Sequence, residues 1–426
     1  MMATKALAGS SSTRTQRWRL GAALAALTLS SAALAQGIYP GDLPKEGYRL
    51  PGGIEPVVRL RTYYFDSEST SGTPTEAWAL GGWVGFRTPW WGDFFQAGAN
   101  YYVSGKLYGP EGKGGTQLLT ADQDSIYVLG EAFGAFRFGG QAFTAYRQLI
   151  DRPFINPNDS RMIPNTFEAY TLSGAVDGVS YIGGYITKEK NRDTDRFVWM
   201  SNVAGGTGNQ EGVAFAGMTW KFGKGGTVRL DEQYAVDVFN TFYADVRYPI
   251  ALDDRTALVL GAQYYPQTSV GADQIGSFST WGYGLQAVVD HGPFGAQFNW
   301  TQTGTGYSTQ NPFGAHPSYN SIQVYDFNSA GEKAWGIRAN VDFASLGAPG
   351  LTAYVFYVSG TDRLANGTGT PLPDRNETDV RADYAFPKGT ALEGLVATFR
   401  YAWTQEDGAA QTGTQLRAYL NYEVRF

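Results

Sequence analysis

The end of the chain carries the pattern that most restricts its fold. From Leu416 to Phe426, apolar and polar side chains alternate, and the sequence closes on an aromatic residue. A period of two describes a strand with one apolar face and one charged face. A strand of this length leaves an unpaired edge unless the sheet closes on its first strand. A closed sheet with an apolar outside and a charged inside is typical of a barrel in lipid, so we expect an all-β fold, a transmembrane antiparallel β-barrel.

The first part of the chain has the composition of a secretory signal. A basic stretch precedes an apolar run over 20–29, and small residues follow up to Ala35. This order is typical of a signal peptide, and a run of about ten apolar residues is too short to span a bilayer as a helix. We expect a signal peptide over 1–35, cleaved near Ala35, and an outer-membrane barrel domain over 36–426.

The composition excludes several other classes of protein. No later segment approaches the roughly 20 continuous apolar residues of a membrane helix, and the mean hydropathy is −0.28. Glycine (55 residues), tyrosine (27), phenylalanine (25) and tryptophan (11) suit turns, strands and membrane interfaces. Cysteine is absent, which excludes disulfides and thiolate metal sites. The net charge of −6 and the lack of a basic domain argue against a nucleic-acid partner.

Alternating segments recur along the chain and give about eighteen candidate strands, an even number as in bacterial barrels. Their connections alternate between long polar segments and tight turns rich in Gly, Pro and Asp. Long external loops and short periplasmic turns are the layout of an outer-membrane barrel. The candidate strands are 57–65, 77–87, 94–104, 125–138, 140–150, 166–174, 179–187, 211–222, 226–238, 240–250, 256–267, 280–290, 294–303, 334–343, 350–360, 378–386, 395–404 and 416–426.

The alternation also predicts which side chains face the lumen. In the last strands, apolar residues such as Phe399 and Leu420 face lipid, which directs the arginines between them inward. Guanidinium groups stay charged and offer planar forks to carboxylates, so a row of them would draw an anionic solute along in steps. A simpler interpretation is that inward acids such as Asp383 pair with these arginines and only fill a polar lumen. The arginines placed inward by alternation are Arg59, Arg61, Arg381, Arg400, Arg417 and Arg425.

A second unusual segment follows the fifth candidate strand. The connection 151–165 contains three prolines and charges of both signs, among them Asp151, Arg152, Asp159 and Arg161. Prolines restrict the backbone, so this sequence suits an ordered loop better than a mobile external one.

Several segments together resemble the OprD family of outer-membrane porins, and the resemblance covers the chain from about residue 51 to its end. The segments that carry it are 146–172, 377–381, 392–402 and 416–422. The resemblance implies an eighteen-stranded, substrate-selective channel whose third external loop folds into the lumen and faces a ladder of basic residues. By matching positions it assigns Arg381, Arg400 and Arg417 to the ladder, and Asp151, Asn156, Asn158, Asp159, Ser160 and Arg161 to the loop.

The function expected from this resemblance is passive uptake across the Gram-negative outer membrane. The solutes would be small and carry a carboxylate, as amino acids, peptides and organic acids do, and they would pass a lumen narrowed by 151–165. The partners are then small solutes and outer-membrane lipid. No enzymatic reaction, cofactor or metal is expected.

Other functions stay open as alternatives. A general-diffusion or sugar-selective porin would share the fold, and Tyr63 and Tyr419 could form a stacking track for sugars. A barrel-embedded hydrolase is a more distant alternative, because such enzymes generally need a His base. His291 and His316 are the two histidines, and neither has a nucleophile partner in the pattern. A receptor with an N-terminal plug does not fit, since 36–55 is too short for a plug domain.

The sequence leaves some questions unanswered. It does not identify the solute, it does not distinguish a monomer from a homotrimer, and it does not reveal gating. The connections 188–210 and 304–333 cannot be placed from the pattern. Whether a loop binds a divalent cation is equally open.

Overall fold

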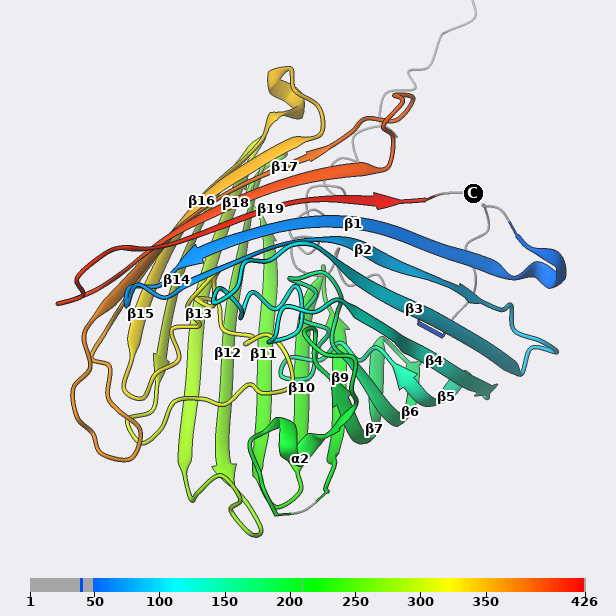
Figure 1. The fold of residues 1–426 in the computed structure, drawn as a ribbon, viewed down its shortest axis with the longest axis horizontal. Coiled ribbons are helices and arrows are strands. Elements are labelled where there is room, and N and C mark those ends of the chain that lie inside the picture. The colour runs from blue at the N-terminus through cyan, green and yellow to red at the C-terminus, as the bar shows by residue number, and fades with distance from the viewer. Residues whose placement is uncertain (1–38, 41–48, 209, 425–426) are drawn as a thin grey trace, which may run out of the picture.

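The chain folds into one antiparallel sheet that closes on itself. The computed structural model describes residues 39–40, 49–208 and 210–424, so the expected signal peptide and Arg425 lie outside the described residues. Strand β1 pairs with β2 on one side and with β19 on the other, from Arg59 opposite Glu423 to Glu68 opposite Thr414. The red β19 therefore lies beside the blue β1 (Figure 1). The predicted closure of the last strand on the first is confirmed.

The sheet has 19 strands, and eighteen of them form the barrel wall because β7 pairs directly with β9. The short β8, Val198–Trp199, pairs only with the end of β7 and was not predicted. Each candidate strand corresponds to one barrel strand, with ends that differ by a few residues. The barrel strands are Glu55–Glu68 (β1), Pro74–Arg87 (β2), Phe95–Tyr108 (β3), Ile126–Phe138 (β4), Gln141–Gln148 (β5), Thr166–Val176 (β6), Val179–Lys190 (β7), Val213–Phe222 (β9), Gly226–Ala235 (β10), Phe239–Ala251 (β11), Thr256–Ser269 (β12), Ser279–His291 (β13), Phe294–Thr303 (β14), Lys333–Asp342 (β15), Leu351–Thr361 (β16), Arg375–Ala385 (β17), Leu395–Glu406 (β18) and Gly413–Glu423 (β19).

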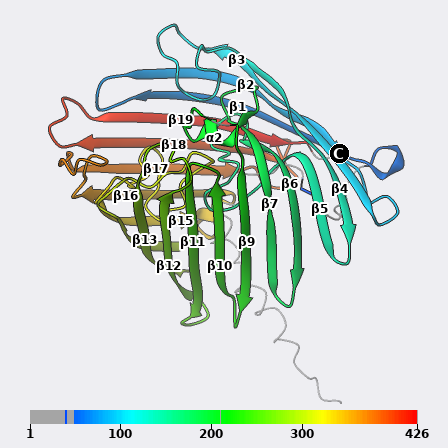
Figure 2. The same cartoon turned by 90° about the horizontal axis from the view of Figure 1, so that it is seen from below.

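Tight turns join the strands at one end of the barrel, as expected. Gly139 and Gly140 connect β4 to β5 with φ of 53° and 79°, and Asp177 and Gly178 connect β6 to β7 with φ of 47° and 82°. Two-residue hairpins of type I′ need positive φ at both positions, which glycine supplies without strain and aspartate tolerates. The view in Figure 2 shows β4 to β7 and β9 to β13 side by side along one wall.

The helices are short. They are η1 (Pro51–Gly53), α2 (Met200–Val203) and η2 (Phe343–Leu346). Among the residues that the structure describes, no helix has the length and apolar character needed to cross a membrane.

The wall is apolar outside and polar inside. On β1 the inward side chains of Arg61 and Tyr63 are each 2% exposed, whereas the outward Leu60 between Arg59 and Arg61 is 51% exposed. An exposed apolar face around a polar interior is the reverse of a water-soluble barrel and suits a wall that faces lipid.

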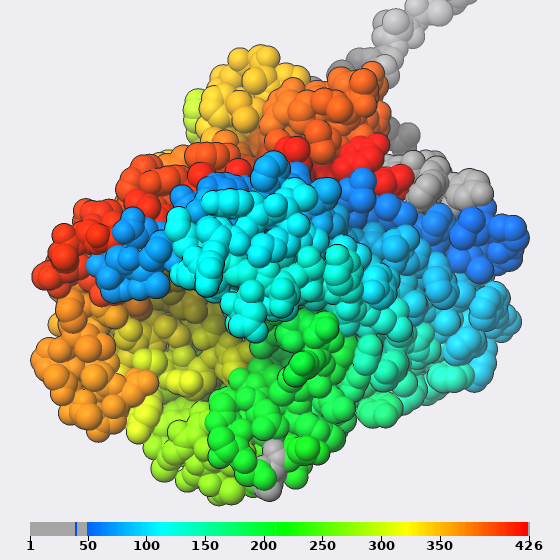
Figure 3. Space-filling model, viewed as in Figure 1, coloured from blue at the N-terminus to red at the C-terminus, as the bar shows by residue number. Residues whose placement is uncertain are grey.

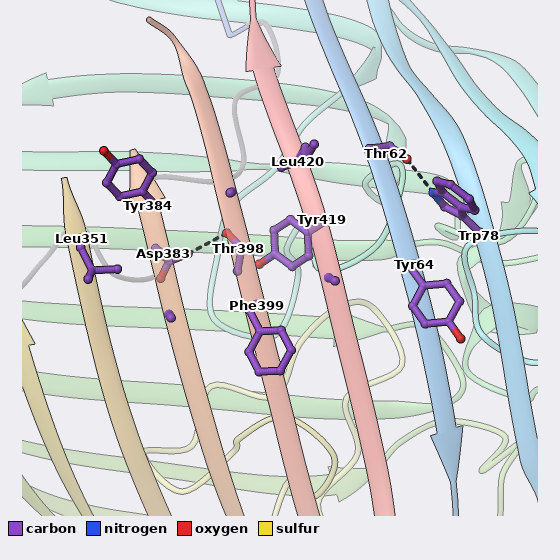
Figure 4. Close-up of a pocket in the computed structure, with 13 residues that line it drawn as sticks. Thr62, Tyr64, Trp78, Leu351, Asp383, Tyr384, Thr398, Phe399, Tyr419 and Leu420 are labelled. Atoms are coloured by element: carbon purple, nitrogen blue, oxygen red, sulfur yellow. Dashed lines mark hydrogen bonds between the residues drawn. The ribbon is translucent and has the colours of Figure 1, made fainter. Parts of the chain in front are cut away.

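Figure 4 shows part of this outer wall, where β16 to β19 meet β1 and β2. Tyr64, Phe399 and Leu420 belong to the outward set and border a shallow apolar hollow of about 480 Å³. On the lumen side of the same strands, the Thr398 hydroxyl donates a hydrogen bond of 2.7 Å to Asp383. The assignment of faces by alternation is therefore correct for these strands.

Candidate functional site

The β5–β6 loop (149–165) lies inside the barrel, and its tip is fastened to β1. The Arg61 guanidinium donates two hydrogen bonds to the Asp159 carboxylate, of 2.6 and 3.1 Å. The two side chains are 2% and 3% exposed. Arg61 also donates to the carbonyl of Arg161 and to Asn421 of β19, at 2.6 Å for the latter. The loop tip is thus held against the seam where the first and last strands meet.

Short-range hydrogen bonds fix the shape of the tip. The backbone N–H of Asn158 donates to the side-chain oxygen of Asn156 at 3.2 Å, and the Ser160 hydroxyl donates to the side-chain oxygen of Asn158 at 3.1 Å. Asn158 has a φ of 42°, a conformation that asparagine tolerates better than most residues. The Tyr63 hydroxyl donates to the Ser160 carbonyl at 3.1 Å. These contacts match the ordered loop predicted from its prolines.

The base of the β5–β6 loop contacts the far wall. Arg152 pairs with Asp231 of β10 at 2.5 Å. Phe154 packs edge-on against Tyr243 of β11 and Tyr265 of β12, with ring centroids 6.1 and 5.4 Å apart. Because its tip reaches β1 and its base reaches β10 to β12, the loop crosses the lumen. Asp151, at the start of the loop, is exposed.

A second loop, the β14–β15 loop (304–332), also folds inward, although the sequence did not place it. Asn156 of the β5–β6 loop donates to the Ala315 carbonyl at 2.9 Å and accepts from the Ala315 N–H at 2.8 Å. Tyr319 donates to Asp245 of β11 at 2.7 Å, and Asn320 donates to Thr301 of β14 at 3.0 Å. Figure 3 shows the surface hollowed between the cyan, orange and green parts of the chain, with yellow residues at the bottom of the hollow.

Two buried carboxylates on β17 hold the far end of the β14–β15 loop. Glu377 accepts from the N–H groups of Val324 and Tyr325, both at 2.7 Å. Asp379 accepts from the N–H of Gln323 at 3.0 Å. Three consecutive backbone donors are thereby satisfied by the wall, which orders a segment that has no regular secondary structure.

Three arginines stand opposite one another on adjacent strands of the wall. Arg400 of β18 is the register partner of Arg381 on β17 and of Arg417 on β19. The row extends further than predicted, because Arg338 of β15 lies 4.0 Å from the ring of Tyr354, the register partner of Arg381. In the sequence, the apolar residues Trp335, Ile337 and Ala339 occupy alternate positions and would face lipid. The same rule could therefore have placed Arg338 on the lumen side.

The arginines of the wall differ in their partners. Arg381 pairs with Asp383 at 2.6 Å. For Arg381, as for Arg61, the structure therefore agrees with the simpler interpretation that an inward acid pairs with the arginine. Arg59 lies over the Trp83 ring at 5.2 Å. Arg417 donates to Gln415 at 2.6 Å and to the Gln323 carbonyl at 2.5 Å, both uncharged acceptors.

The buried Nε of Arg400 has no hydrogen-bond acceptor among the residues that the structure describes. Within the part of the chain that the structure describes, neither Arg400 nor Arg417 forms an ion pair with a carboxylate. The carboxylate of Asp379 acts on both of them through its charge but without such a contact. These two guanidinium groups are therefore ladder members without an ion-pair partner among the described residues.

Two loop arginines add positive charge at the same place. Arg161 donates to the Thr116 carbonyl at 2.8 Å, and Arg192 donates to the Ser160 hydroxyl at 2.6 Å and to Gln117. These acceptors are neutral as well. Arg192 lies in the β7–β9 connection (191–212), which the sequence did not place, and no pattern in the sequence indicated it.

The pKa values of these loop arginines report their surroundings. Burial lowers the pKa of Arg161 well below its usual range, and the charges of Arg417 and Arg192 lower it further. Arg400 acts on Arg161 in the same direction. Burial lowers the pKa of Arg192 to about 10, and the charge of Arg417 is the next cause. The four cations are therefore close enough to repel one another.

Three residues named for the alternative functions, Tyr63, Tyr419 and His316, are buried against neighbouring side chains. Tyr63 and Tyr419 stack at 4.6 Å, but they are 2% and 9% exposed, so they offer little ring surface to a passing sugar. His316 is buried between Phe154 and Tyr265, and its Nε2 lies 2.8 Å from the Thr309 hydroxyl.

Comparisons with known proteins agree with this architecture. The sequence model of the family described as outer membrane porin, OprD family, matches residues 53–426. The chain is 24% identical over 457 residues to Porin D of Pseudomonas aeruginosa, covering 96% of this chain and 99% of that protein. Two solved structures from Pseudomonas aeruginosa have a similar fold. One is OpdK with vanillate (TM-score 0.78, 18% identity, 88% of this chain and 99% of that one). The other is OccK2 (OpdF) in complex with glucuronate (TM-score 0.76, 16% identity, 89% of this chain and 100% of that one).

Proposed function

Because the chain belongs to the OprD family of outer membrane porins, we propose that its lumen selects small solutes that carry a carboxylate. Membership places the barrel in the outer membrane of a Gram-negative bacterium, where it lets small solutes pass. The family and fold indicate a channel rather than an enzyme. The finer proposal concerns which solutes pass and which residues they meet.

The observation that carries the proposal is the group of Arg161, Arg192, Arg400 and Arg417. Their acceptors among the described residues are carbonyl, amide and hydroxyl oxygens, and none of the four has a carboxylate partner there. Like charges held together repel, and a solute carboxylate would relieve that repulsion while accepting two hydrogen bonds from a guanidinium fork. The charge of Asp379 acts on Arg400 and Arg417, and those of Asp193 and Asp326 act on Arg192, but none of these carboxylates forms an ion pair with the four arginines among the described residues. The site thus leaves guanidinium donors, such as the Nε of Arg400, for the carboxylate of a solute.

The proposed path runs between the β5–β6 loop and the arginine wall. In this account the solute carboxylate meets Arg192 and Ser160 and then Arg400 and Arg381, which are all partly exposed. The buried Arg161 and Arg417 attract it through their charge. Each contact needs to be strong enough to attract the solute and weak enough to release it. The paired Arg61, with Asp159 as its partner, is assigned to holding the loop.

Other expected residues are proposed for supporting roles. Asp151, Arg152, Asn156 and Asn158 shape the loop, and Arg59 and Arg425 contribute charge to the wall. The proposal is supported by the solved structures with vanillate and with glucuronate, since each of those molecules carries a carboxylate. Residues 1–35 are proposed to act as the export signal.

The test is the ion selectivity of the purified channel in a planar bilayer. The double variant Arg400→Gln, Arg417→Gln should lower the permeability ratio of chloride to potassium severalfold, as measured from reversal potentials in a KCl gradient. The control is Arg247→Gln on β11, whose guanidinium already pairs with Asp245 at 3.3 Å. An equal ratio in the double variant, the control and the unmodified protein would overturn the role of the arginine wall.

A further inference from the structure

A row of charged and aromatic side chains crosses the outer surface where β5, β6, β7 and β8 end. Register pairs join Arg147 to Glu168, Glu168 to Lys188, and Lys188 to Trp199. These four residues, here called the rim row, lie at the loop ends of their strands, the ends opposite the tight turns. Arg147, Glu168 and Lys188 are 21%, 15% and 32% exposed, so they are partly covered rather than free in solvent.

The rim row carries two cations and one anion. Arg147 donates to Glu168 at 3.1 Å and to the Leu129 carbonyl at 2.8 Å. Lys188 lies 3.7 Å from Glu168 and forms no hydrogen bond to another described residue. An ammonium group has three donors. The rim row therefore has one net positive charge. The N–H groups of Lys188 have no hydrogen-bond acceptor among the described residues, so they can bind a group from outside the protein.

Aromatic rings hold the two cations in place. The Arg147 guanidinium lies 4.0 Å from the Phe197 ring centroid, and the Lys188 ammonium lies 5.2 Å from the Trp199 ring. Cation–π contacts of this kind fix a cation without neutralising it. The short β8 strand thus brings Trp199 to the rim beside Lys188.

The next positions on the same wall change in a regular order. On β6, Tyr170 lies two residues further from the rim than Glu168, and Leu172 lies two residues beyond Tyr170. Tyr170 pairs in register with Tyr185, which is three residues from Lys188 because the register of β6 and β7 shifts after Glu168. Tyr170 is 54% exposed and Leu172 is 38% exposed. At roughly 3.3 Å per residue, each step is about 7 Å. Charge, then tyrosine, then leucine is the order of headgroup, interface and acyl chain in a bilayer leaflet.

We propose that the rim row binds a phosphate group of a phosphorylated glycolipid in the outer leaflet, with the lipid chains lying along Tyr170 and Leu172. A phosphate has the charge that Arg147 and Lys188 leave uncompensated and enough oxygens to accept from both. The wall at β1 and β2 has the opposite balance, because Asp66 stands beside Glu76 in register and Lys113 pairs with Glu76 at 2.8 Å. If the rim row were only part of the band of side chains that any outer-membrane barrel presents at the membrane interface, these two walls would not be expected to differ in charge.

Native mass spectrometry of the detergent-purified protein tests this proposal with bisphosphorylated lipid A and its dephosphorylated form. The unmodified protein should retain the phosphorylated form at least about fivefold more strongly, as expected for two cations near a lipid phosphate. The double variant Arg147→Gln, Lys188→Gln should lose that preference, and the matched control Lys113→Gln should keep it.

A second variant keeps the test informative if the double variant does not fold. Lys188→Gln alone removes no hydrogen bond within the described chain and should fold normally, which its heat-dependent gel mobility can verify, while losing part of the preference. The proposal would be overturned if the unmodified protein bound both lipids equally or if the double variant kept the preference. A lipid-free dimer that the double variant loses would also overturn it, and would assign the rim row to contact between copies.

Discussion

At the scale of single residues, the ion pair between Arg61 and Asp159 decides where the β5–β6 loop lies. Both side chains are almost fully buried. Each charge is acceptable in that environment because the other lies beside it, and removal of one partner leaves an uncompensated charge. The pair therefore holds the loop in place, whereas Arg400 and Arg417 have no ion-pair partner among the described residues.

Asp159→Asn should loosen the loop tip. Loss of one partner from a buried pair costs on the order of 3–5 kcal/mol, so we expect a lower thermal unfolding temperature in detergent and a noisier open-channel current. Lys333→Gln is the control, because Lys333 pairs with Asp362 while the two side chains are 44% and 60% exposed. Its effect should stay below about 1 kcal/mol. If the two variants had the same unfolding temperature and the same current noise, the ion pair between Arg61 and Asp159 would not be what holds the loop.

His316 should make the β14–β15 loop sensitive to acid. Burial lowers the pKa of His316, and the charge of Asp326 opposes that shift only in part. The unfolded histidine, with a pKa of about 6.5, takes up a proton before the folded one does. The loop is therefore fully stable above that pH and loses stability as the pH falls toward the lower folded pKa, by up to about 1.4 kcal/mol per pH unit.

Current noise recorded from about pH 7.5 down to about pH 5 measures this effect. The unmodified channel should become noisier in acid, and His316→Gln should respond less because the titrating group is gone. If the two proteins respond to acid identically, His316 is not the sensitive group.

At the scale of elements, the β5–β6 loop should control the size of the opening. It crosses the lumen from β1 to β10, so deletion of 154–162 removes the bridge and should raise single-channel conductance severalfold. Deletion of 408–410, an exposed part of the connection between β18 and β19, is the matched control and should leave conductance unchanged. An unaltered conductance after the first deletion would mean that the loop is not the narrowest part of the path.

The elements also separate what the sequence could predict from what it could not. The strands were predictable because a wall between lipid and a polar lumen requires a period of two, which Leu416 to Glu423 displays. The β14–β15 loop was not predictable, because its order depends on partners far away in sequence, such as Glu377 for Val324. Arg192 was missed for the same reason, since its partner Gln117 lies 75 positions away.

At the scale of the whole molecule, the pairing of β1 with β19 closes the barrel and also positions the residues of the proposed function. Closure at this seam brings Arg61 of the first strand next to Asn421 of the last. The β5–β6 loop is fastened there, beside the strands that carry Arg400 and Arg417. The contact that completes the barrel thus also positions the loop near Arg400 and Arg417.

The most direct test of carboxylate selection is block of the single-channel current by matched pairs of solutes. Vanillate and glucuronate would each be compared with an uncharged counterpart of the same size, vanillyl alcohol and glucose, in a planar bilayer. We predict a small conductance that at least one carboxylate reduces and its neutral counterpart does not. A large conductance that neither member of any pair reduces, or equal block by both members, would contradict the account.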